Sequence, residues 1–336
     1  MQRLTLEPTD FQSLEDPQGE LAAELDRQVL RTPEIDHYCA STLWSVPAHL
    51  GLMSGHRGLL FAGEPGYVAL AQGQHEEGWW YAQPLEAAWM LACPFVGPEP
   101  ERLVRGFREL YMAMGEPWHV VMVGGVVYQG RLFRSIVQQF GQWQRILLGP
   151  QTRRHVADLS AGSEGFLARR SRNFRKGLRR AERQAQRLGL EFERIEPRAV
   201  ADPYTLYHRV QAVEARSWKG VSGVGINQGD MQRFYAVMIP YLWARGALRL
   251  IFARHEGVDV GYILGGVFAD TYRGLQFSFD DAFRDVGLGN LLQIRQIGAL
   301  ADEPGVVRYD LGTENPYKHR WAEAVLDTVT VILARW

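Results

Sequence analysis

The segment Arg284–Leu292 constrains this chain more than any other, because it combines an arginine with a Gly-x-Gly pattern. It reads Arg-Asp-Val-Gly-Leu-Gly-Asn-Leu-Leu and lies between a strand-like run that ends at Phe279 and a helix-like run that begins at Asn290. Glycines allow a tight turn and let backbone N–H groups approach a ligand, and the following helix adds the positive end of its dipole. The segment therefore predicts a site for phosphate or pyrophosphate, as in a nucleotide-like group donor; an ordinary turn before a helix is the alternative.

Chain length and composition indicate two domains. The 336 residues are 46% hydrophobic, which is enough for a large core, and the length exceeds the usual range of a single domain. A break at Gly149-Pro150 indicates a boundary, so we expect an N-terminal domain over residues 1–152 and a C-terminal domain over residues 153–336. The formal net charge is −1, which gives no reason to expect a general surface for nucleic acid or for an anionic membrane.

Targeting features and cysteine usage favour a cytoplasmic location. The first 18 residues lack a basic segment followed by an apolar run, so no secretory signal is expected. No stretch approaches the ~20 apolar residues of a membrane-spanning helix. Cys39 and Cys93 show no metal-ligand spacing and fit a reducing compartment; a single disulfide is the alternative.

Each half of the chain predicts helices mixed with strands. In the first half we expect helices over 21–30, 100–114 and 132–140, a hairpin over 57–72 and a strand over 118–123. In the second half we expect helices over 164–188, 203–218, 228–245 and 290–301, and strands over 155–159, 190–195, 248–254, 258–268, 272–279, 306–311 and 328–334. The fold class that follows is α+β, with a mixed sheet flanked by helices in each half.

The expected helix over 164–188 has a strongly cationic face. Basic residues spaced by three or four positions form one stripe, which consists of Arg169, Arg172, Lys176, Arg180, Arg183 and Arg187. Apolar residues occupy the opposite side, so the helix is amphipathic. Such a face can bind the phosphates of a group donor, of an RNA or of a lipid carrier; a solvated charged surface is the alternative.

Polar residues at two strand ends suit acid–base chemistry. Asp280 follows a strand, where a carboxylate can accept a proton from an attacking amine or hydroxyl; a turn or capping residue is the alternative. The loop over 310–321 concentrates charged and aromatic groups after another strand. In this loop Glu314 is a second carboxylate, Tyr317 can act as an acid or an anchor, and Lys318 can bind an anion.

The segment Glu214–Gly220 is a smaller candidate for substrate contact. It contains Trp218 and Lys219, although a tryptophan buried in the core is the alternative reading. The nine histidines show neither zinc-ligand spacing nor a Ser/His/Asp order. We therefore expect neither a metal site nor a hydrolase triad.

Taken in their order, these segments resemble the CelD/BcsL-type branch of the GNAT acyltransferase superfamily. The matching residues are the basic helix Arg169–Arg187, Glu214 with Ser217-Trp218-Lys219, Phe279-Asp280 leading to Gly289-Asn-Leu-Leu292, and Asp310-Leu-Gly312 with Tyr317-Lys318 and Trp321. They cover roughly residues 155–325, and the glycine loop is similar to the general GNAT pyrophosphate pattern. The resemblance implies two tandem GNAT-like domains, each with a mostly antiparallel sheet, related to the FemAB-like aminoacyltransferases. The first domain would be degenerate, because it lacks the glycine loop.

The resemblance also implies a reaction and its residues. Acyl-coenzyme A would donate an acyl group, acetyl in the simplest case, to an amine or hydroxyl of a small molecule or of a saccharide or cell-envelope precursor, without a metal. The donor would be held by Arg284, Gly287, Gly289, Asn290 and Leu291. The catalytic candidates are Asp280, Glu314 and Tyr317, and the candidates for substrate contact are Glu214, Trp218, Lys219 and Lys318.

Two alternative functions remain: one uses a different donor, and the other is not enzymatic. An aminoacyl-tRNA donor suits the basic helix, although the near-neutral net charge favours acyl-coenzyme A. A non-catalytic binding protein with a decayed site suits a tandem chain in which one half has lost its loop, but the intact loop in the second half argues against it.

Overall fold

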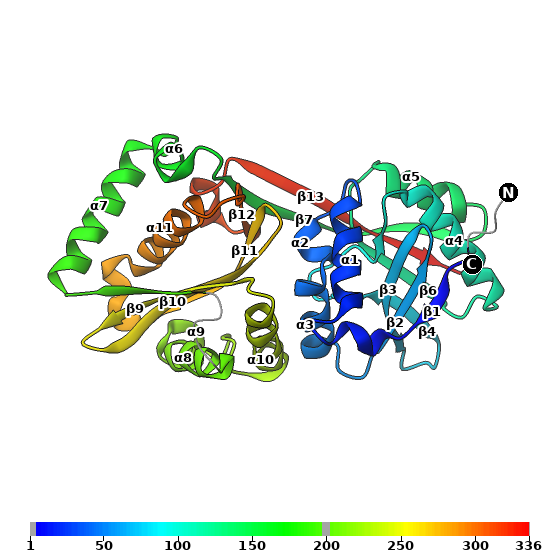
Figure 1. The fold of residues 1–336 in the computed structure, drawn as a ribbon, viewed down its shortest axis with the longest axis horizontal. Coiled ribbons are helices and arrows are strands. Elements are labelled where there is room, and N and C mark those ends of the chain that lie inside the picture. Colours follow the sequence, from blue (N-terminus) through cyan, green and yellow to red (C-terminus); the bar gives the residue numbers. More distant parts are fainter. Residues whose placement is uncertain (1–4, 197–201, 336) are drawn as a thin grey trace. The chain divides into compact units, whose positions relative to one another are not determined.

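The computed structural model describes residues 5–196 and 202–335, which group into two compact units (Figure 1). The first unit contains the residues up to Arg153 and those from Asp327 onward, and the second contains Arg154–Leu326. The expected boundary after residue 152 lies next to this division, but the C-terminal segment had been assigned to the second domain. The strand β13 (Ala324–Ala334) instead pairs with β6 of the first unit, a non-local partner that no pattern in the sequence reveals.

The first unit combines a mixed sheet with helices. Its helical elements are η1 (Phe11–Leu14), α1 (Glu20–Arg31), α2 (His37–Ala40), α3 (Thr42–Leu52), α4 (Pro100–Ala113) and α5 (Arg131–Phe140). Its strands are β1 (Glu7–Thr9), β2 (Arg57–Gly63), β3 (Gly66–Gln74), β4 (Trp80–Pro84), β5 (Phe95–Val96) and β6 (Val120–Val126), with β13. They follow the order β1-β2-β3-β4-β6-β13, and β5 pairs with β3. The expected hairpin is present as β2 and β3, with Gly63 opposite Gly66.

The second unit repeats this kind of organisation. Its helical elements are α6 (Gly162–Ala168), α7 (Arg172–Arg187), α8 (Pro203–Arg216), α9 (Trp218–Val221), α10 (Gly229–Ala244), η2 (Asp281–Val286), α11 (Leu288–Ala301) and η3 (Pro316–Arg320). Its strands are the end of β7 (Arg145–Asp158), β8 (Glu191–Ile195), β9 (Leu248–His255), β10 (Val258–Phe268), β11 (Thr271–Phe279) and β12 (Arg308–Thr313). The order is β7-β12-β11-β10-β9-β8, and each neighbouring pair is antiparallel except β11 with β12. The sheet is therefore mixed and mostly antiparallel, as expected.

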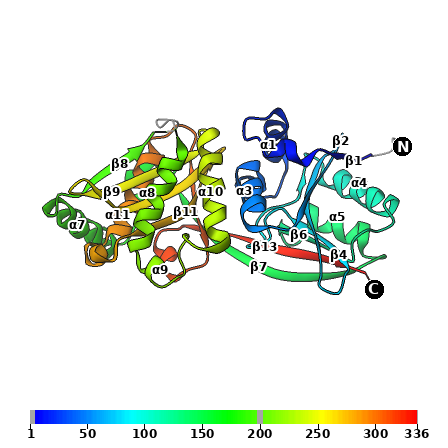
Figure 2. The same cartoon turned by 90° about the horizontal axis from the view of Figure 1, so that it is seen from below.

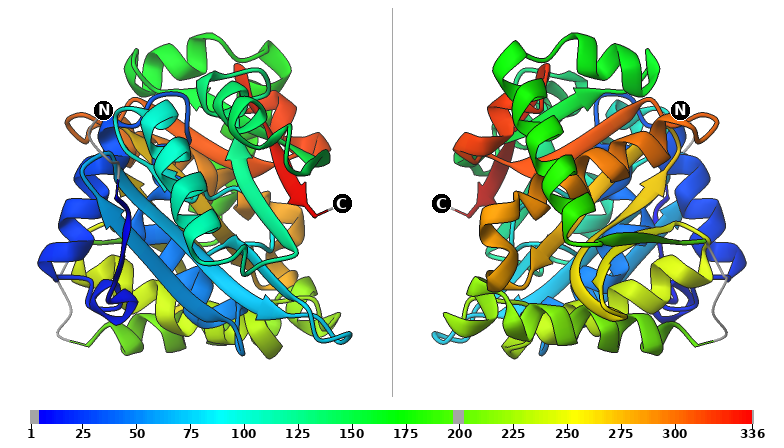
Figure 3. Two further views of the ribbon diagram at one scale, coloured as in Figure 1. Left: turned by 90° about the vertical axis from the view of Figure 1, so that its right-hand side faces the viewer. Right: turned by 90° about the vertical axis from the view of Figure 1, so that its left-hand side faces the viewer.

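Helices cover both faces of the sheet in the second unit. In Figures 1 and 2, α7 and α11 lie on one side of β9–β11, and α8 and α10 lie on the other. Figure 3 shows α11 in orange running along the strands next to α7 in green. A buried cluster joins the first layer to the sheet, through Ala181 and Ala185 of α7, Leu291 and Leu292 of α11, and Ile263 of β10. Among the described helices, none is both long and apolar enough to cross a bilayer.

Two expected helices are each broken at a serine. The helix expected over 164–188 is interrupted, because Ser171 begins α7 and its hydroxyl accepts a hydrogen bond from the N–H of Phe174 at 3.2 Å. Ser217 likewise separates α8 from α9 and caps Gly220 N–H at 3.2 Å. Serine favours this N-cap position because its oxygen satisfies a free N–H group of the first turn. The correction removes Arg169 from the cationic stripe, since it lies outside α7.

Candidate functional site

The strands β11 and β12 separate along their length, which opens a gap in the sheet. They pair in parallel at three positions, the last of which places Arg273 opposite Asp310. Beyond that point β12 pairs with β7 alone among the described strands, with Gly312 opposite His155. A register shift between Asp310 and Gly312, with a φ of 89° at Gly312, accompanies the separation. The segment 274–279 of β11 therefore has no β12 residue opposite it.

A cavity of about 470 Å³ lies where the two strands have separated. It is lined by Trp218, Lys219, Ile263, Leu264, Gly274–Phe279, Gln293, Tyr309, Leu311, Asn315, Tyr317 and Lys318. Apolar side chains form most of its wall, and a few amine, amide and phenol groups interrupt them. Such a mixture is typical of a site for a small molecule, in which the polar groups fix orientation.

A second cavity of about 240 Å³ adjoins the glycine loop. It is lined by Phe277, Phe279, Arg284, Gly287, Gly289, Asn290, Gln293, Tyr317, Arg320 and Trp321. Four residues, Phe277, Phe279, Gln293 and Tyr317, line both cavities. The glycine loop and the gap between the strands are thus parts of one continuous site.

The glycine loop presents the first turn of a helix to the second cavity. Gly287 ends η2 and begins α11 with a φ of 78°, a left-handed conformation that favours glycine. No side chain of the described residues caps α11, and Asn290 and Leu291 already donate to the Gly287 carbonyl, so the N–H groups of the first turn before Asn290 are those available to an anion. Arg284 is 64% exposed and pairs with Asp281 at 2.7 Å. An exposed pair of this kind is weak, so the arginine can turn towards a phosphate at little cost.

Gly289 is required for the close approach of α11 to β11. A Cβ atom at this position would lie 3.0 Å from Cε1 of Phe279 and 3.1 Å from Cε2 of Phe277. Both distances are shorter than ordinary carbon–carbon contacts, which begin at ~3.5 Å. The second glycine of the pattern therefore allows the helix to begin directly against the strand end.

Gln293 is a buried amide without a partner at the junction of the two cavities. Its side chain is 2% exposed, and neither Oε1 nor Nε2 has a hydrogen-bond partner among the described residues. Leaving such groups unpaired costs on the order of 1–3 kcal/mol for each buried polar group. A ligand with amide groups would satisfy both atoms. Gln293 was not among the expected residues, although it lies three positions after Asn290 and hence on the same helix face.

Tyr317 and Lys318 project from η3 to the larger cavity. Burial raises the pKa of Tyr317 to about 12, so the phenol stays protonated at neutral pH. Burial, with a contribution from the positive charge of Arg273, lowers the pKa of Lys318 to about 8. Its Nζ donates a hydrogen bond to the carbonyl of Thr313 at 2.6 Å. The site therefore combines a phenol that keeps its proton with an amine that is partly neutral near pH 8.

Lys219 is a second buried amine in the same cavity. Its Nζ donates to the Phe277 carbonyl at 2.8 Å and to Oε1 of Gln276 at 3.0 Å, which holds it against β11. Burial lowers the pKa of Lys219, and the charge of Glu214 opposes that shift. Trp218, 47% exposed, lines the cavity next to it.

Glu214 does not line the larger cavity; its side chain lies in the buried core. It is completely buried, accepts a hydrogen bond from Oη of Tyr262 at 2.9 Å and accepts another from the N–H of Ile226 at 3.3 Å. Among the residues expected to bind the donor, Leu291 likewise lies outside both cavities. It is fully buried in the core, and its N–H bonds to the carbonyl of Gly287 at 3.3 Å.

The two carboxylates expected to be catalytic lie outside both cavities. Asp280 caps η2 by accepting from the N–H of Ala282 at 3.0 Å and pairs with Arg216 at 2.9 Å. Glu314 lies beside His155 and His319. Neither cavity is lined by an acidic side chain of the described residues. The capping alternative for Asp280 is therefore the role that the structure gives it.

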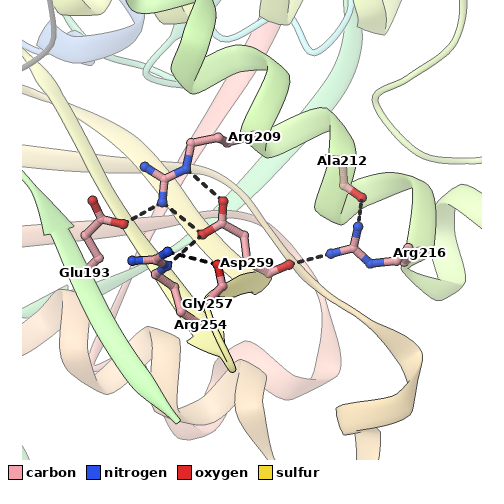
Figure 4. Close-up of polar contacts among 7 residues, drawn as sticks. All are labelled: Glu193, Arg209, Ala212, Arg216, Arg254, Gly257 and Asp259. Atoms are coloured by element: carbon pink, nitrogen blue, oxygen red, sulfur yellow. Dashed lines mark hydrogen bonds and ion pairs between the residues drawn. The ribbon is translucent and has the colours of Figure 1, made fainter.

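Arginines of α8 attach this helix to β10 and so position α9 with Trp218. Figure 4 shows Arg209 between Asp259 and Glu193, with its Nε 2.8 Å from Oδ2 of Asp259. The same view shows Arg216 donating to the carbonyl of Ala212 and to the backbone carbonyl of Asp259. Because α9 begins two residues after Arg216, these bonds fix the start of the segment that carries Lys219.

Helix α7 packs beside the glycine loop through its apolar face. A Cβ at Gly287 would lie 3.4 Å from Cβ of Ala181, which belongs to α7. The exposed basic residues of α7 are Arg172, Lys176, Arg179, Arg180, Arg183 and Arg187. In the described part of the chain, none of these six side chains forms an ion pair, whereas Glu182 of the same helix pairs with Arg295. Their positive charges are therefore not neutralised by an acidic partner among the described residues.

Comparison with known proteins agrees with this geometry. Residues 172–319 match the family model of an acetyltransferase (GNAT) domain. This part of the chain is therefore similar to a GNAT domain. The match contains the glycine loop, both separated strands and Tyr317. No curated protein sequence matches the chain.

Solved structures show the same fold over nearly the whole chain. The structure of FemX aligns with a TM-score of 0.67 and 13% identity, covering 92% of this chain and 95% of FemX. A protein of unknown function from Bacteroides thetaiotaomicron aligns with a TM-score of 0.61 and 11% identity, covering 98% and 99%. The C-terminal domain of a putative lysylphosphatidylglycerol synthetase from Agrobacterium fabrum aligns with a TM-score of 0.53 and 14% identity, covering 93% and 92%. At these identities the alignments establish the fold.

Proposed function

We propose that this protein transfers an acyl group, acetyl in the simplest case, from acyl-coenzyme A to an amine or hydroxyl. The observation that carries the proposal is the unpaired amide of Gln293, at the point where the glycine-loop cavity meets the gap between β11 and β12. Coenzyme A combines a pyrophosphate with a pantetheine arm that contains two amides. A donor of this form matches both the loop and the buried amide.

The donor would use the two cavities in sequence. Its pyrophosphate would bind the first turn of α11, near Gly287 and Gly289, with Arg284 and Arg320 as counter-charges. Its pantetheine arm would follow the part of β11 that has no partner strand, and its amides would bond to Gln293 and to the free edge of β11. The cationic face of α7 supports the proposal, because a helix that packs against the loop carries further positive charge on its exposed side.

The larger cavity would hold the reacting groups. The acceptor nitrogen or oxygen attacks the thioester carbonyl, and a backbone N–H group of β11 stabilises the developing oxyanion. The carbon–sulfur bond then breaks, and Tyr317 donates its hydrogen bond or its proton to the departing thiolate. Neutral Lys318 accepts the proton that the acceptor releases. Because Asp280 and Glu314 lie outside the cavity, we assign the proton transfers to Tyr317 and Lys318.

The side chains around the larger cavity suggest the class of acceptor. Trp218 and the aromatic residues of β11 offer surfaces on which a sugar ring can stack, and Lys219 can orient a polar group. A small molecule, or a saccharide or cell-envelope precursor as in the CelD/BcsL-type resemblance, fits such a wall. We further propose that the protein acts in the cytoplasm, because acyl-coenzyme A is made there.

Calorimetric titration with acetyl-coenzyme A tests the donor, and thiol release tests the chemistry. We expect one donor molecule per chain and release of free thiol that depends on an added acceptor, measured with a thiol reagent over amino sugars, amino acids and polyamines. No binding of any acyl-coenzyme A would overturn the proposal. Binding with no release across hydroxyl and amine acceptors would support the non-catalytic alternative instead.

An aminoacyl-tRNA donor is the second candidate, and the unpaired basic face of α7 is the observation that favours it. Phosphate contacts of this kind make binding strongly dependent on salt. A gel-shift titration with tRNA at low and moderate ionic strength distinguishes the two donors. Retention of tRNA that weakens steeply with salt, and that is lost in an Arg180→Glu/Arg183→Glu variant, would favour this donor over acyl-coenzyme A.

A further inference from the structure

A second cluster of polar side chains lies next to the site but outside both cavities. His155 of β7, Glu314 and His319 converge, so that one ligand atom of each lies within 4.8 Å of the others. Nε2 of His319 is 3.0 Å from Oε1 of Glu314, and Nε2 of His155 is 3.6 Å from Oε2 of the same carboxylate. The two imidazole rings meet edge to face, with 4.5 Å between their centroids.

His155 is the member of the cluster that its surroundings leave unexplained. It is 2% exposed, and its Nε2 has no hydrogen-bond partner among the described residues. A buried ring nitrogen without a partner destabilises the fold unless a ligand occupies it. Its backbone is held by the sheet, opposite Gly312 of β12, so the ring cannot easily leave. Glu314 and His319 are 48% and 59% exposed, which leaves a path for an ion and space for water.

We propose that His155, Glu314 and His319 bind a Zn²⁺ ion. Zinc prefers imidazole nitrogen and carboxylate oxygen at ~2.0–2.2 Å, which places the ligand atoms of a tetrahedral site ~3.3 Å apart. Oε1 of Glu314 is 3.0 Å from His319 and Oε2 is 3.6 Å from His155, so each ring has one carboxylate oxygen near that distance. Water completes the fourth position on the exposed side. Calcium and magnesium prefer an all-oxygen set, so the two imidazoles select a transition metal.

The ion would connect the loop after β12 to β7. That loop carries Tyr317 and Lys318 to the larger cavity, while Glu314 and His319 lie against His155. Zinc would thereby hold η3 in place without contacting the reacting atoms. This consequence for the active site rests on the proposed function, whereas zinc binding itself does not.

Titration of the tag-free, EDTA-treated chain with ZnCl₂ tests the proposal by calorimetry. We expect one ion per chain, and ~10-fold or greater loss of affinity in His319→Ala and in Glu314→Ala. His208→Ala is the matched control, since His208 is an exposed histidine on α8 whose ring lies 3.3 Å from Gln211 and away from the cluster. That variant should bind zinc as the wild type does.

Two further measurements detect zinc binding without relying on acyl transfer, and they distinguish loss of the site from misfolding of a variant. Zinc should raise the melting temperature of the wild type and of His208→Ala but not that of His319→Ala, and Co²⁺ should produce visible absorption bands of a four-coordinate site. Absence of stoichiometric binding, or equal affinity in His319→Ala and the wild type, would overturn the proposal. Zinc binding in a chain that binds no acyl-coenzyme A would leave this site standing and overturn only the proposed function.

Discussion

Arg273 and Asp310 form the last pair at which β11 and β12 lie side by side, and their side chains join at the same place. Nη1 of Arg273 is 2.7 Å from Oδ1 of Asp310, and Nη1 of Arg154 is 2.6 Å from Oδ2 of the same carboxylate. All three side chains are buried. One carboxylate thus holds two guanidinium groups at the point from which the gap in the sheet opens, so it connects the stability of the second unit to the shape of its cavity.

Asp310→Asn should destabilise the second unit strongly. The change leaves two buried guanidinium groups without their anion, and breaking a buried pair in this way costs about 3–5 kcal/mol. Urea denaturation measures the loss. Asp327→Asn is the matched control, because Asp327 pairs with Arg153 at 2.8 Å with both side chains about half exposed. That pair should contribute about 0–1 kcal/mol, and an equal loss in the two variants would contradict the prediction.

Gly289→Ala should weaken donor binding, whereas Gly298→Ala should not. A methyl group at Gly289 would crowd Phe277 and Phe279, so the two rings or the start of α11 must shift by a few tenths of an ångström. We expect the Kd for acetyl-coenzyme A to rise ~10-fold, equivalent to ~1.4 kcal/mol, in a calorimetric titration. Gly298 lies in the same helix with nothing within 4 Å of its added Cβ, so alanine there should stabilise the chain by ~1 kcal/mol. Unchanged donor affinity in Gly289→Ala would count against the loop as the pyrophosphate site.

Gln293→Met should stabilise the protein and weaken donor binding at the same time. Methionine has a similar volume and removes an amide that has no partner among the described residues. Relief of the unpaired group should increase the free energy of unfolding by about 1 kcal/mol, measured by urea denaturation. The Kd for acetyl-coenzyme A should rise, because the variant lacks the groups that would bond to the pantetheine amides. A less stable variant with wild-type affinity would show that the amide serves the fold and not the ligand.

Tyr317→Phe should lower kcat ~100-fold with little change in the KM for acetyl-coenzyme A, because it removes a proton donor and keeps the ring. Since the pKa of Tyr317 is about 12, the wild-type rate should show no fall from loss of this proton below pH 10. Initial rates of thiol release from pH 6 to pH 10 test both statements. Tyr204→Phe, at a half-exposed tyrosine of α8, is the control and should keep wild-type kcat. Equal kcat in the two variants would remove Tyr317 from the mechanism.

Lys318→Met should reveal a stability difference that depends on pH. The pKa of Lys318 falls from its ordinary value of 10.5 to about 8 in the folded chain. Between these values the unfolded chain binds more protons, so the wild type gains stability as the pH rises from 8 to 10.5. Relative to Lys318→Met, the gain should be on the order of 3 kcal/mol over this window and absent below pH 7. Urea denaturation of both proteins at pH 7, 9 and 10 tests it, and a constant difference would contradict the lowered pKa.

Local patterns predicted the parts of the site that lie within one stretch of sequence. The glycine loop, the helix after it and the strand before it all appear at the expected positions, because turn chemistry and hydrophobic period are properties of neighbouring residues. Trp218, Lys219 and Lys318 line the larger cavity, and their contact with a substrate stays a prediction. Asp280 caps η2 and pairs with Arg216, and the sequence alone does not distinguish a capping carboxylate from a catalytic one.

Other features depend on contacts between distant residues. The unpaired amide of Gln293 lies where the two cavities meet, and the pKa of Lys318 depends on burial and on Arg273. The cluster of His155 with Glu314 and His319 joins positions more than 150 residues apart, so no motif spacing could reveal it. The pairing of β13 with β6 of the first unit likewise depends on contacts between residues that are distant in the sequence.

The sequence by itself thus determined the α+β class, the division into two halves and the position of the glycine loop. These follow from short-range propensity and from the conformational freedom of glycine. Only the tertiary structure decided where β11 leaves β12 and which side chains that separation exposes to a ligand. Strand pairing and burial are set by the whole chain, and they determine the charge and hydrogen-bonding state of each group in the site.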